Sequence, residues 1–165
     1  MIKNMVEAVC GTGKGKTSLA VGKCLKACAM GKSAIVIQFL KGNERGDLDF
    51  LQTLDSIDIK IFRFERQESC YSELSYEEQQ EEKTNILNGL NFARKVIATR
   101  ECDFLVLDEL LGLIEKGIAS QELVTELLGL KDEAMQIMLT GDKVPEWLYD
   151  CVESVTTLTT MTADE

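Results

Sequence analysis

The amino-acid sequence predicts a doubly wound α/β fold with a mainly parallel sheet. Short apolar segments alternate with longer segments of helical spacing along the whole chain. Several of the apolar segments are continuous runs rich in β-branched residues, which is typical of strands buried on both faces. Because strand-helix-strand connections are right-handed and place successive strands in one sheet, this alternation favours a sheet covered by helices on both faces.

Six segments are predicted to be strands. The second is a continuous run rich in β-branched residues, and the fourth is apolar throughout. The third alternates between apolar and polar residues and ends in a phenylalanine. In chain order, the predicted strands are residues 3–10, 33–39, 57–64, 104–107, 134–140 and 155–161.

The segments between these strands carry helical spacing and helix-end signals. Ser75 and Glu78 form a capping box, Ser120 is a suitable N-cap, and Pro145 fits a first helical turn, where its missing N–H costs nothing. Gly31 is expected to end the first helix in a left-handed conformation. The predicted helices are residues 17–30, 47–54, 75–100, 120–128 and 145–152.

Length and composition indicate one ordinary globular domain. The 165 residues match the usual size of a single domain, so we expect residues 1–165 to form one nucleotide-binding unit. No apolar run reaches the roughly 18 residues that a membrane span needs, and the first ten residues lead into a strand instead of a signal peptide. We therefore expect a cytoplasmic protein with no membrane partner.

Charge and residue usage exclude several functions. The net charge of −10 repels phosphate backbones, so no nucleic-acid partner is expected and any phosphate must be held locally. The absence of histidine removes the usual neutral-pH general base and every Ser-His or Cys-His nucleophile pair. The six cysteines form no C-x-x-C pair, so we interpret them as reduced and mostly buried hydrophobic residues.

A glycine-rich segment connects the first predicted strand to the first predicted helix. Glycines allow close approach of the backbone, so successive N–H groups can point into one concavity and hold phosphate oxygens. Lys16 is expected to reach those oxygens with its ammonium group, and the Thr17 hydroxyl is expected to bind Mg²⁺. The residues predicted to bind the triphosphate of ATP are Gly11, Thr12, Gly13, Lys14, Gly15, Lys16, Thr17 and Ser18.

This loop departs from the general phosphate-binding motif G-x-x-x-x-G-K-[ST], because Cys10 stands where the first glycine is expected. The alternative is a glycine-rich turn without a ligand. Such a turn does not require Gly-Lys-Thr at its end, so the pattern favours phosphate binding.

A second candidate site follows the fourth predicted strand. Asp108 and Glu109 end an apolar run at the place where phosphate-loop enzymes carry a carboxylate that serves Mg²⁺. Since consecutive strand residues point to opposite faces, the two carboxylates are expected to have different roles. The alternative is a strand that simply ends in polar residues. Ligands of such sheets bind beyond the carboxyl ends of the strands, which predicts one rim formed by residues 11–17, 38–42, 108–109 and 140–143.

Five segments resemble, in the same order, those of the ATP:corrinoid adenosyltransferase family. They are GTGKGKTS from Gly11, VIQFLKG from Val36, LVLDEL from Leu105, TGDKVPEWL from Thr140 and VTTLTTM from Val155. The phosphate loop of that family commonly reads GNGKGKTT and also lacks the first glycine, so Cys10 agrees with the resemblance. The resemblance implies a P-loop NTPase fold of the RecA-like type.

The resemblance also implies a reaction and its participants. A cobalt(I) corrinoid would attack the 5′ carbon of Mg-ATP and release tripolyphosphate, with Lys16, Lys41 and Glu109 in the active site. The metal site would involve Thr17, Asp108 and Glu109. ATP, Mg²⁺ and a corrinoid are thus the expected small molecules, a reduced flavoprotein is the candidate electron donor, and a homodimer is the candidate assembly.

Two features keep other functions open. Asp142, followed by Lys143, stands where the family usually has an arginine, and the aromatic residues Phe62, Phe64 and Tyr71 could equally belong to the core or contact a corrinoid. The alternatives are a P-loop ATPase or phosphotransferase, and a non-catalytic ATP-binding regulatory protein. Tripolyphosphate among the products would distinguish the adenosyltransferase from both.

Overall fold

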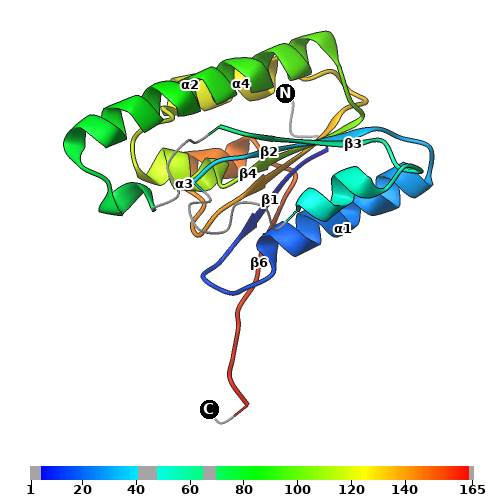
Figure 1. Cartoon of the computed structure of the whole chain (residues 1–165), viewed down its shortest axis with the longest axis horizontal. Helices are drawn as coiled ribbons and strands as arrows, with labels where there is room; N and C mark the ends of the chain where they lie inside the picture. The colour runs from blue at the N-terminus through cyan, green and yellow to red at the C-terminus, as the bar shows by residue number, and fades with distance from the viewer. Residues whose placement is uncertain (1–4, 41–47, 65–69, 164–165) are drawn as a thin grey trace.

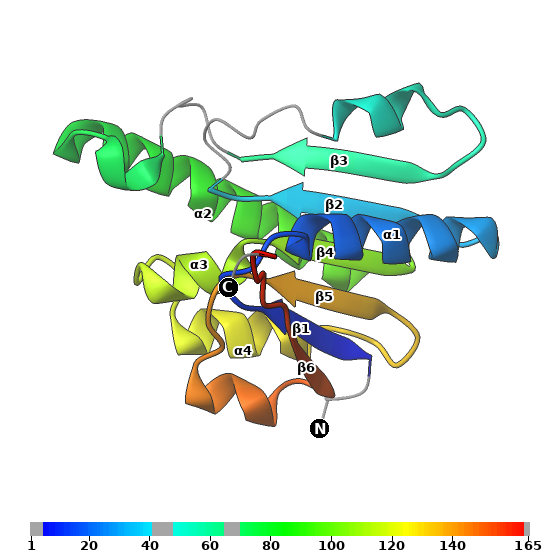
Figure 2. The ribbon, with the colours of Figure 1, turned by 90° about the horizontal axis from the view of Figure 1, so that it is seen from below.

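The structure of the chain, a computed structural model, describes residues 5–40, 48–64 and 70–163. In these residues six strands form one sheet with the order β3-β2-β4-β5-β1-β6, in which every neighbouring pair is parallel. Figure 2 shows the strands side by side in this order. Their bounds are β1 (Val6–Cys10), β2 (Ala34–Gln38), β3 (Ile59–Arg63), β4 (Phe104–Asp108), β5 (Gln136–Thr140) and β6 (Ser154–Thr157).

Helices cover both faces of this sheet, which confirms the doubly wound α/β prediction. Helix α1 lies on one face, and α2, α3 and α4 lie on the other (Figure 1). The α-helices are α1 (Lys16–Ala29), α2 (Tyr76–Thr99), α3 (Leu110–Glu115) and α4 (Gln121–Gly129). In the described part of the connections there are also three short 3₁₀ helices: η2 (Asp49–Thr53), η3 (Tyr71–Glu73) and η4 (Glu146–Asp150).

Alternate strand residues point into two separate cores. Ile35, Ile37 and Leu105 are buried on the face covered by α2, α3 and α4. Val36 and Val106, their neighbours along the chain, are buried on the face covered by α1. Since both sides of each central strand must be apolar, the continuous apolar runs of the sequence follow directly from this two-sided burial.

The helix-end predictions are confirmed where they concern α-helices. Ser75 accepts a hydrogen bond from the Glu78 N–H at 3.3 Å, and the Glu78 carboxylate accepts one from the Ser75 N–H at 2.8 Å. Ser120 accepts a hydrogen bond from the Leu123 N–H at 3.1 Å. Gly31 follows α1 with a φ of +81°, a conformation that glycine adopts without strain.

Two other helix predictions are wrong. The segments predicted as helices 47–54 and 145–152 form the 3₁₀ helices η2 and η4 instead, and residue 47 lies outside the described residues. Each of these short helices buries one side chain of its own, Leu51 or Leu148, so packing stabilises a single turn and not a longer amphipathic helix. Pro145 accordingly lies at the N-cap with an extended backbone.

Helix α3 has no counterpart among the predicted elements. Its residues Leu110, Leu111, Gly112 and Leu113 are all buried, so the segment has no polar face and shows no helical period. This short helix starts directly after β4 and forms one wall of the site described next.

Candidate nucleotide-binding site

The loop between β1 and α1 adopts a conformation that requires glycine. Gly11 has a φ of +114° and Gly15 a φ of +102°, and Gly15 is the N-cap of α1. A side chain at either position would be strained. The loop therefore directs its backbone toward the N-terminus of a 14-residue helix, where N–H groups and the helix dipole favour an anion.

The segment after β6 lies against this loop. Because β6 pairs in parallel with β1, the chain leaves both strands at the same edge, and the Leu158 N–H donates to the Cys10 carbonyl at 2.8 Å. The Gly13 N–H donates to the Leu158 carbonyl at 3.3 Å, and the Lys14 N–H donates to the Thr160 hydroxyl at 2.7 Å. The N–H groups of Gly13 and Lys14 thus have their partners in the segment after β6.

Lys16 points back across the same loop. Its ammonium donates to the carbonyl oxygens of Gly11 and Gly13, the latter at 3.2 Å, and lies 3.3 Å from the Asp142 carboxylate. The Lys16 side chain is only 12% exposed, whereas that of Asp142 is 53% exposed. The lysine of the phosphate loop is therefore held in the loop by two carbonyls and one charged partner.

Asp108 is the buried centre of a hydrogen-bond network. The strand register places Gln38 of β2 beside Asp108 of β4, and Thr140 of β5 on its other side. Asp108 is fully buried and accepts hydrogen bonds from the Thr140 hydroxyl at 2.6 Å, the Gln38 amide at 3.1 Å and the Thr17 hydroxyl at 3.1 Å. The Arg63 guanidinium donates to Gln38 at 3.1 Å and so fixes which end of the amide faces Asp108.

Glu109 lies between β4 and α3. It is the N-cap of α3 with a φ of +69°, and its N–H donates to the Thr140 hydroxyl at 2.9 Å. The expectation of opposite faces assumed a continuous strand, but β4 ends at Asp108 and the chain turns there. A side chain on Gly112 would lie 2.9 Å from a Glu109 carboxylate oxygen, so the glycine leaves room for this carboxylate.

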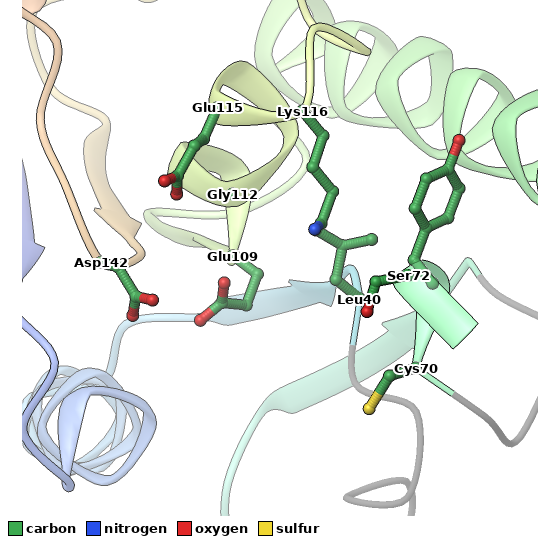
Figure 3. A pocket seen from close by; sticks show the side chains of 9 residues that line it. Leu40, Cys70, Ser72, Glu109, Gly112, Glu115, Lys116 and Asp142 are labelled. Atoms are coloured by element: carbon green, nitrogen blue, oxygen red, sulfur yellow. The ribbon is translucent and has the colours of Figure 1, made fainter. Parts of the chain in front are cut away.

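A pocket opens beside Glu109, on the side away from the sheet interior. Figure 3 shows the Asp142 and Glu109 carboxylates on one side of it and Lys116 on the other. The Lys116 ammonium lies 5.8 Å from the centre of the Tyr71 ring. The pocket is lined by Leu40, Cys70, Tyr71, Ser72, Glu109, Gly112, Glu115, Lys116 and Asp142.

The structure brings most of the predicted site residues to one edge of the sheet. Gly11 to Thr17, Asp108 and Glu109 lie at the carboxyl ends of β1 and β4, while Thr12 and Ser18 are exposed. Lys41 lies outside the described residues.

The sequence interpretation missed several partners of the site residues. They are Thr140 and Gln38 beside Asp108, Asp142 beside Lys16, and Leu158 and Thr160 on the loop. Polar residues that directly end apolar strands, as Gln38 and Thr140 do, are the signal that could have identified the first two.

Two other expectations about side chains also have structural answers. Phe62 packs on Phe92 of α2 with ring centroids 4.7 Å apart, and Phe64 packs on the same ring at 5.5 Å, which favours the core assignment for both.

Burial raises the pKa of Cys24 and of Cys102 to about 12, so both thiols stay protonated and behave as small hydrophobic residues. Cys70, in contrast, is exposed.

The parallel sheet, its strand order and the loop before α1 place the chain in the P-loop NTPase class with a RecA-like fold. The fold is similar to that of the KaiC-like protein PH0186 from Pyrococcus horikoshii OT3, with a TM-score of 0.52 at 20% identity. That similarity covers 86% of this chain and 62% of the archaeal protein.

Within this class, the family model of the ATP:corrinoid adenosyltransferase BtuR/CobO/CobP matches residues 2–163, and the chain belongs to this family. The description of this family names ATP and a corrinoid as its substrates.

A curated relative, the uncharacterized protein all2391 of Nostoc sp. (strain PCC 7120), is 28% identical over 155 residues. The similarity covers 87% of this chain and 40% of that relative, so the chain spans less than half of its length. Among the helices of the described segments, none has the length and apolar character needed to cross a membrane.

Proposed function

We propose that this protein transfers the 5′-deoxyadenosyl group of ATP to a cobalt(I) corrinoid and releases tripolyphosphate. The observation that carries this proposal is the phosphate loop, with Lys16 inside it and Thr17 beside the buried Asp108, in a chain without histidine. The family match supports the same reaction.

ATP binding is assigned to the loop and the first turn of α1. Backbone N–H groups of Gly15 to Thr17 are the proposed donors to triphosphate oxygens, since those of Gly13 and Lys14 donate to Leu158 and Thr160. Lys14 and Lys16 supply two positive charges next to them. A highly charged leaving group is stabilised by such donors, because tripolyphosphate gains negative charge when the carbon–oxygen bond breaks. The loop thus serves both binding and departure of the leaving group.

Mg²⁺ fits the oxygen groups near Thr17. The Thr17 hydroxyl lies 3.1 Å from both Asp108 carboxylate oxygens, so its proton can point to Asp108 and its lone pairs toward a metal ion. Asp108 has its other hydrogen bonds to Thr140 and Gln38, which suits a residue that orients the ligands. When bound, the ion would neutralise charge on the triphosphate. Thr17 would be its ligand, and Glu109 is a carboxylate of the adjoining pocket that could serve it.

The bond-forming step needs no general base from the protein. The cobalt(I) centre supplies the electron pair for the new cobalt–carbon bond, and the pair of the broken C5′–O bond leaves with tripolyphosphate. Cobalt is formally oxidised by two electrons and the carbon is reduced, so no proton is transferred in this step. The remaining tasks of the chain are orientation and charge stabilisation, which agrees with the absence of histidine.

Tyr71 is the aromatic residue that we assign to substrate contact. Phe62 and Phe64 pack on Phe92, whereas Tyr71 lines the pocket that also contains Glu109 and Lys116. An aromatic ring at this position can pack against an adenine or a corrinoid.

The test is incubation of the purified protein with Mg-ATP and a corrinoid reduced to cobalt(I) under anaerobic conditions. Spectroscopy should detect the cobalt–carbon bond, and chromatography should find tripolyphosphate in equal amount. The Lys16→Ala variant should lose this activity. Cleavage of ATP to ADP and phosphate, with several verified cobalt(I) corrinoids left unchanged, would instead identify an ATPase.

A further inference from the structure

Asp142 occupies a fixed position at the mouth of the phosphate loop. Its carbonyl oxygen accepts a hydrogen bond from the Gly11 N–H at 2.9 Å, which ties the segment after β5 to the loop. The preceding Gly141 lies against α3, and a side chain there would collide with Leu111. The backbone at Asp142 is thus held on both sides, and the Asp142 carboxylate lies 3.3 Å from the Lys16 ammonium.

The carboxylate of Asp142 lies where it affects any phosphate that enters the loop. It is 3.3 Å from the Lys16 ammonium, whose other partners are two neutral carbonyl groups. A phosphate that binds Lys16 must therefore share this lysine with Asp142 or displace it. In either case two negative groups come close together beside Lys16, whose side chain is 12% exposed. Water screens part of this repulsion, because the Asp142 side chain is 53% exposed.

Charged groups of both signs line the pocket beside Asp142. Asp142 and Glu109 lie together at one side of the pocket, and Lys116 lies across it (Figure 3). The Asp142 carboxylate repels a bound ligand, and this repulsion increases with the negative charge of the ligand. Bound magnesium neutralises about half of the charge of ATP, so the penalty falls more heavily on metal-free ATP than on Mg-ATP.

We propose that Asp142 is a specificity-determining residue that makes the site select the magnesium complex of ATP over metal-free ATP. This inference rests on the proposed function, because it assumes that ATP binds at the phosphate loop. It assigns to Asp142 a role in ligand selection through the charge of Lys16, and it requires no contact between Asp142 and the metal.

The experiment is calorimetric titration of the intact protein and of Asp142→Asn with ATP, once with excess Mg²⁺ and once with a chelator. Asparagine keeps the size of the side chain and removes its charge. We expect the variant to bind metal-free ATP about tenfold more tightly and Mg-ATP less than about threefold more tightly. The ratio of the two dissociation constants should therefore shrink.

Asp150→Asn is the matched control, because Asp150 is an exposed aspartate at the end of η4 and the change alters the net charge equally. It should leave both dissociation constants unchanged. Asp142→Ser, also titrated, tests the same loss of charge with a smaller side chain. Thermal unfolding of each variant verifies that the fold is intact.

Weaker binding of both ligands by Asp142→Asn, or an equal change for both, would overturn the inference. If the native protein binds Mg-ATP and Lys16→Ala does not, the ATP site stands even when the role of Asp142 fails. If neither the native protein nor Asp142→Asn binds ATP in any form, both proposals fail together.

Discussion

Glu109 and Asp108 are adjacent residues with different surroundings. Asp108 is fully buried and binds Thr17, Thr140 and Gln38, whereas Glu109 lines the pocket from the N-cap of α3. The two side chains thus lie in different surroundings, and the cause is the chain turn after β4 and not strand alternation. Their different roles remain a prediction. We regard Asp108 as the residue that orients Thr17, and Glu109 as the carboxylate near the ligand.

We expect Glu109→Gln to weaken Mg-ATP binding by about tenfold and to change binding of metal-free ATP by less than about threefold. The change removes a carboxylate that we propose to serve Mg²⁺, so it affects the metal-bound ligand most. Titration calorimetry with and without Mg²⁺ measures both values. Glu115→Gln, in the same pocket at the end of α3, is the control and should preserve the response to Mg²⁺. An unaltered metal response in Glu109→Gln would remove Glu109 from the site.

At the scale of elements, the loop after β1 and the segment after β6 form one unit. Leu158 and Thr160 accept hydrogen bonds from the N–H groups of Gly13 and Lys14, and a side chain on Gly13 would lie 2.7 Å from the Leu158 carbonyl. The glycines of the loop therefore have two purposes. They allow the backbone conformation, and they leave space for the neighbouring segment.

A comparison of Gly11→Ala with Gly15→Ala separates these two purposes. Both residues have positive φ, but a side chain on Gly11 would collide with the Leu158 carbonyl, whereas that on Gly15 would meet open space. We expect Gly15→Ala to lower the free energy of unfolding by about 1 kcal/mol and Gly11→Ala by about 2 to 4 kcal/mol. Urea unfolding curves measure the difference. Equal losses would show that the segment after β6 does not restrict the loop.

Element ends were predicted well where local chemistry decides them, and poorly elsewhere. The capping box at Ser75 and the N-cap at Ser120 depend on hydrogen bonds over three residues, so the local sequence contains them completely. The lengths of η2 and η4 depend on how many of their residues pack against the rest of the protein, and this cannot be read from the local sequence.

For the whole molecule, ligand binding and stability are coupled. A ligand that binds only the folded chain stabilises it, by about 2.7 kcal/mol at a concentration of 100 times its dissociation constant. For a chain of 165 residues we therefore expect saturating Mg-ATP to raise the midpoint of thermal unfolding by roughly 5 to 10 °C. Differential scanning calorimetry measures the shift. Lys16→Ala should show a much smaller shift at the same concentration, and a full shift in this variant would place ATP elsewhere on the protein.

The sequence by itself determined the alternation of strands and helices, the glycine-rich loop before α1 and the carboxylates at the end of β4, because each is a local pattern of residue types. The tertiary structure decided the contacts between these parts. Lys16 and Asp142 are 126 residues apart, Lys14 and Thr160 are 146 apart, and Asp108 and Thr140 are 32 apart. Hydrophobic periodicity shows which segments are strands but not their order in the sheet. Only that order, with β1 between β5 and β6, brings these residues to the same edge.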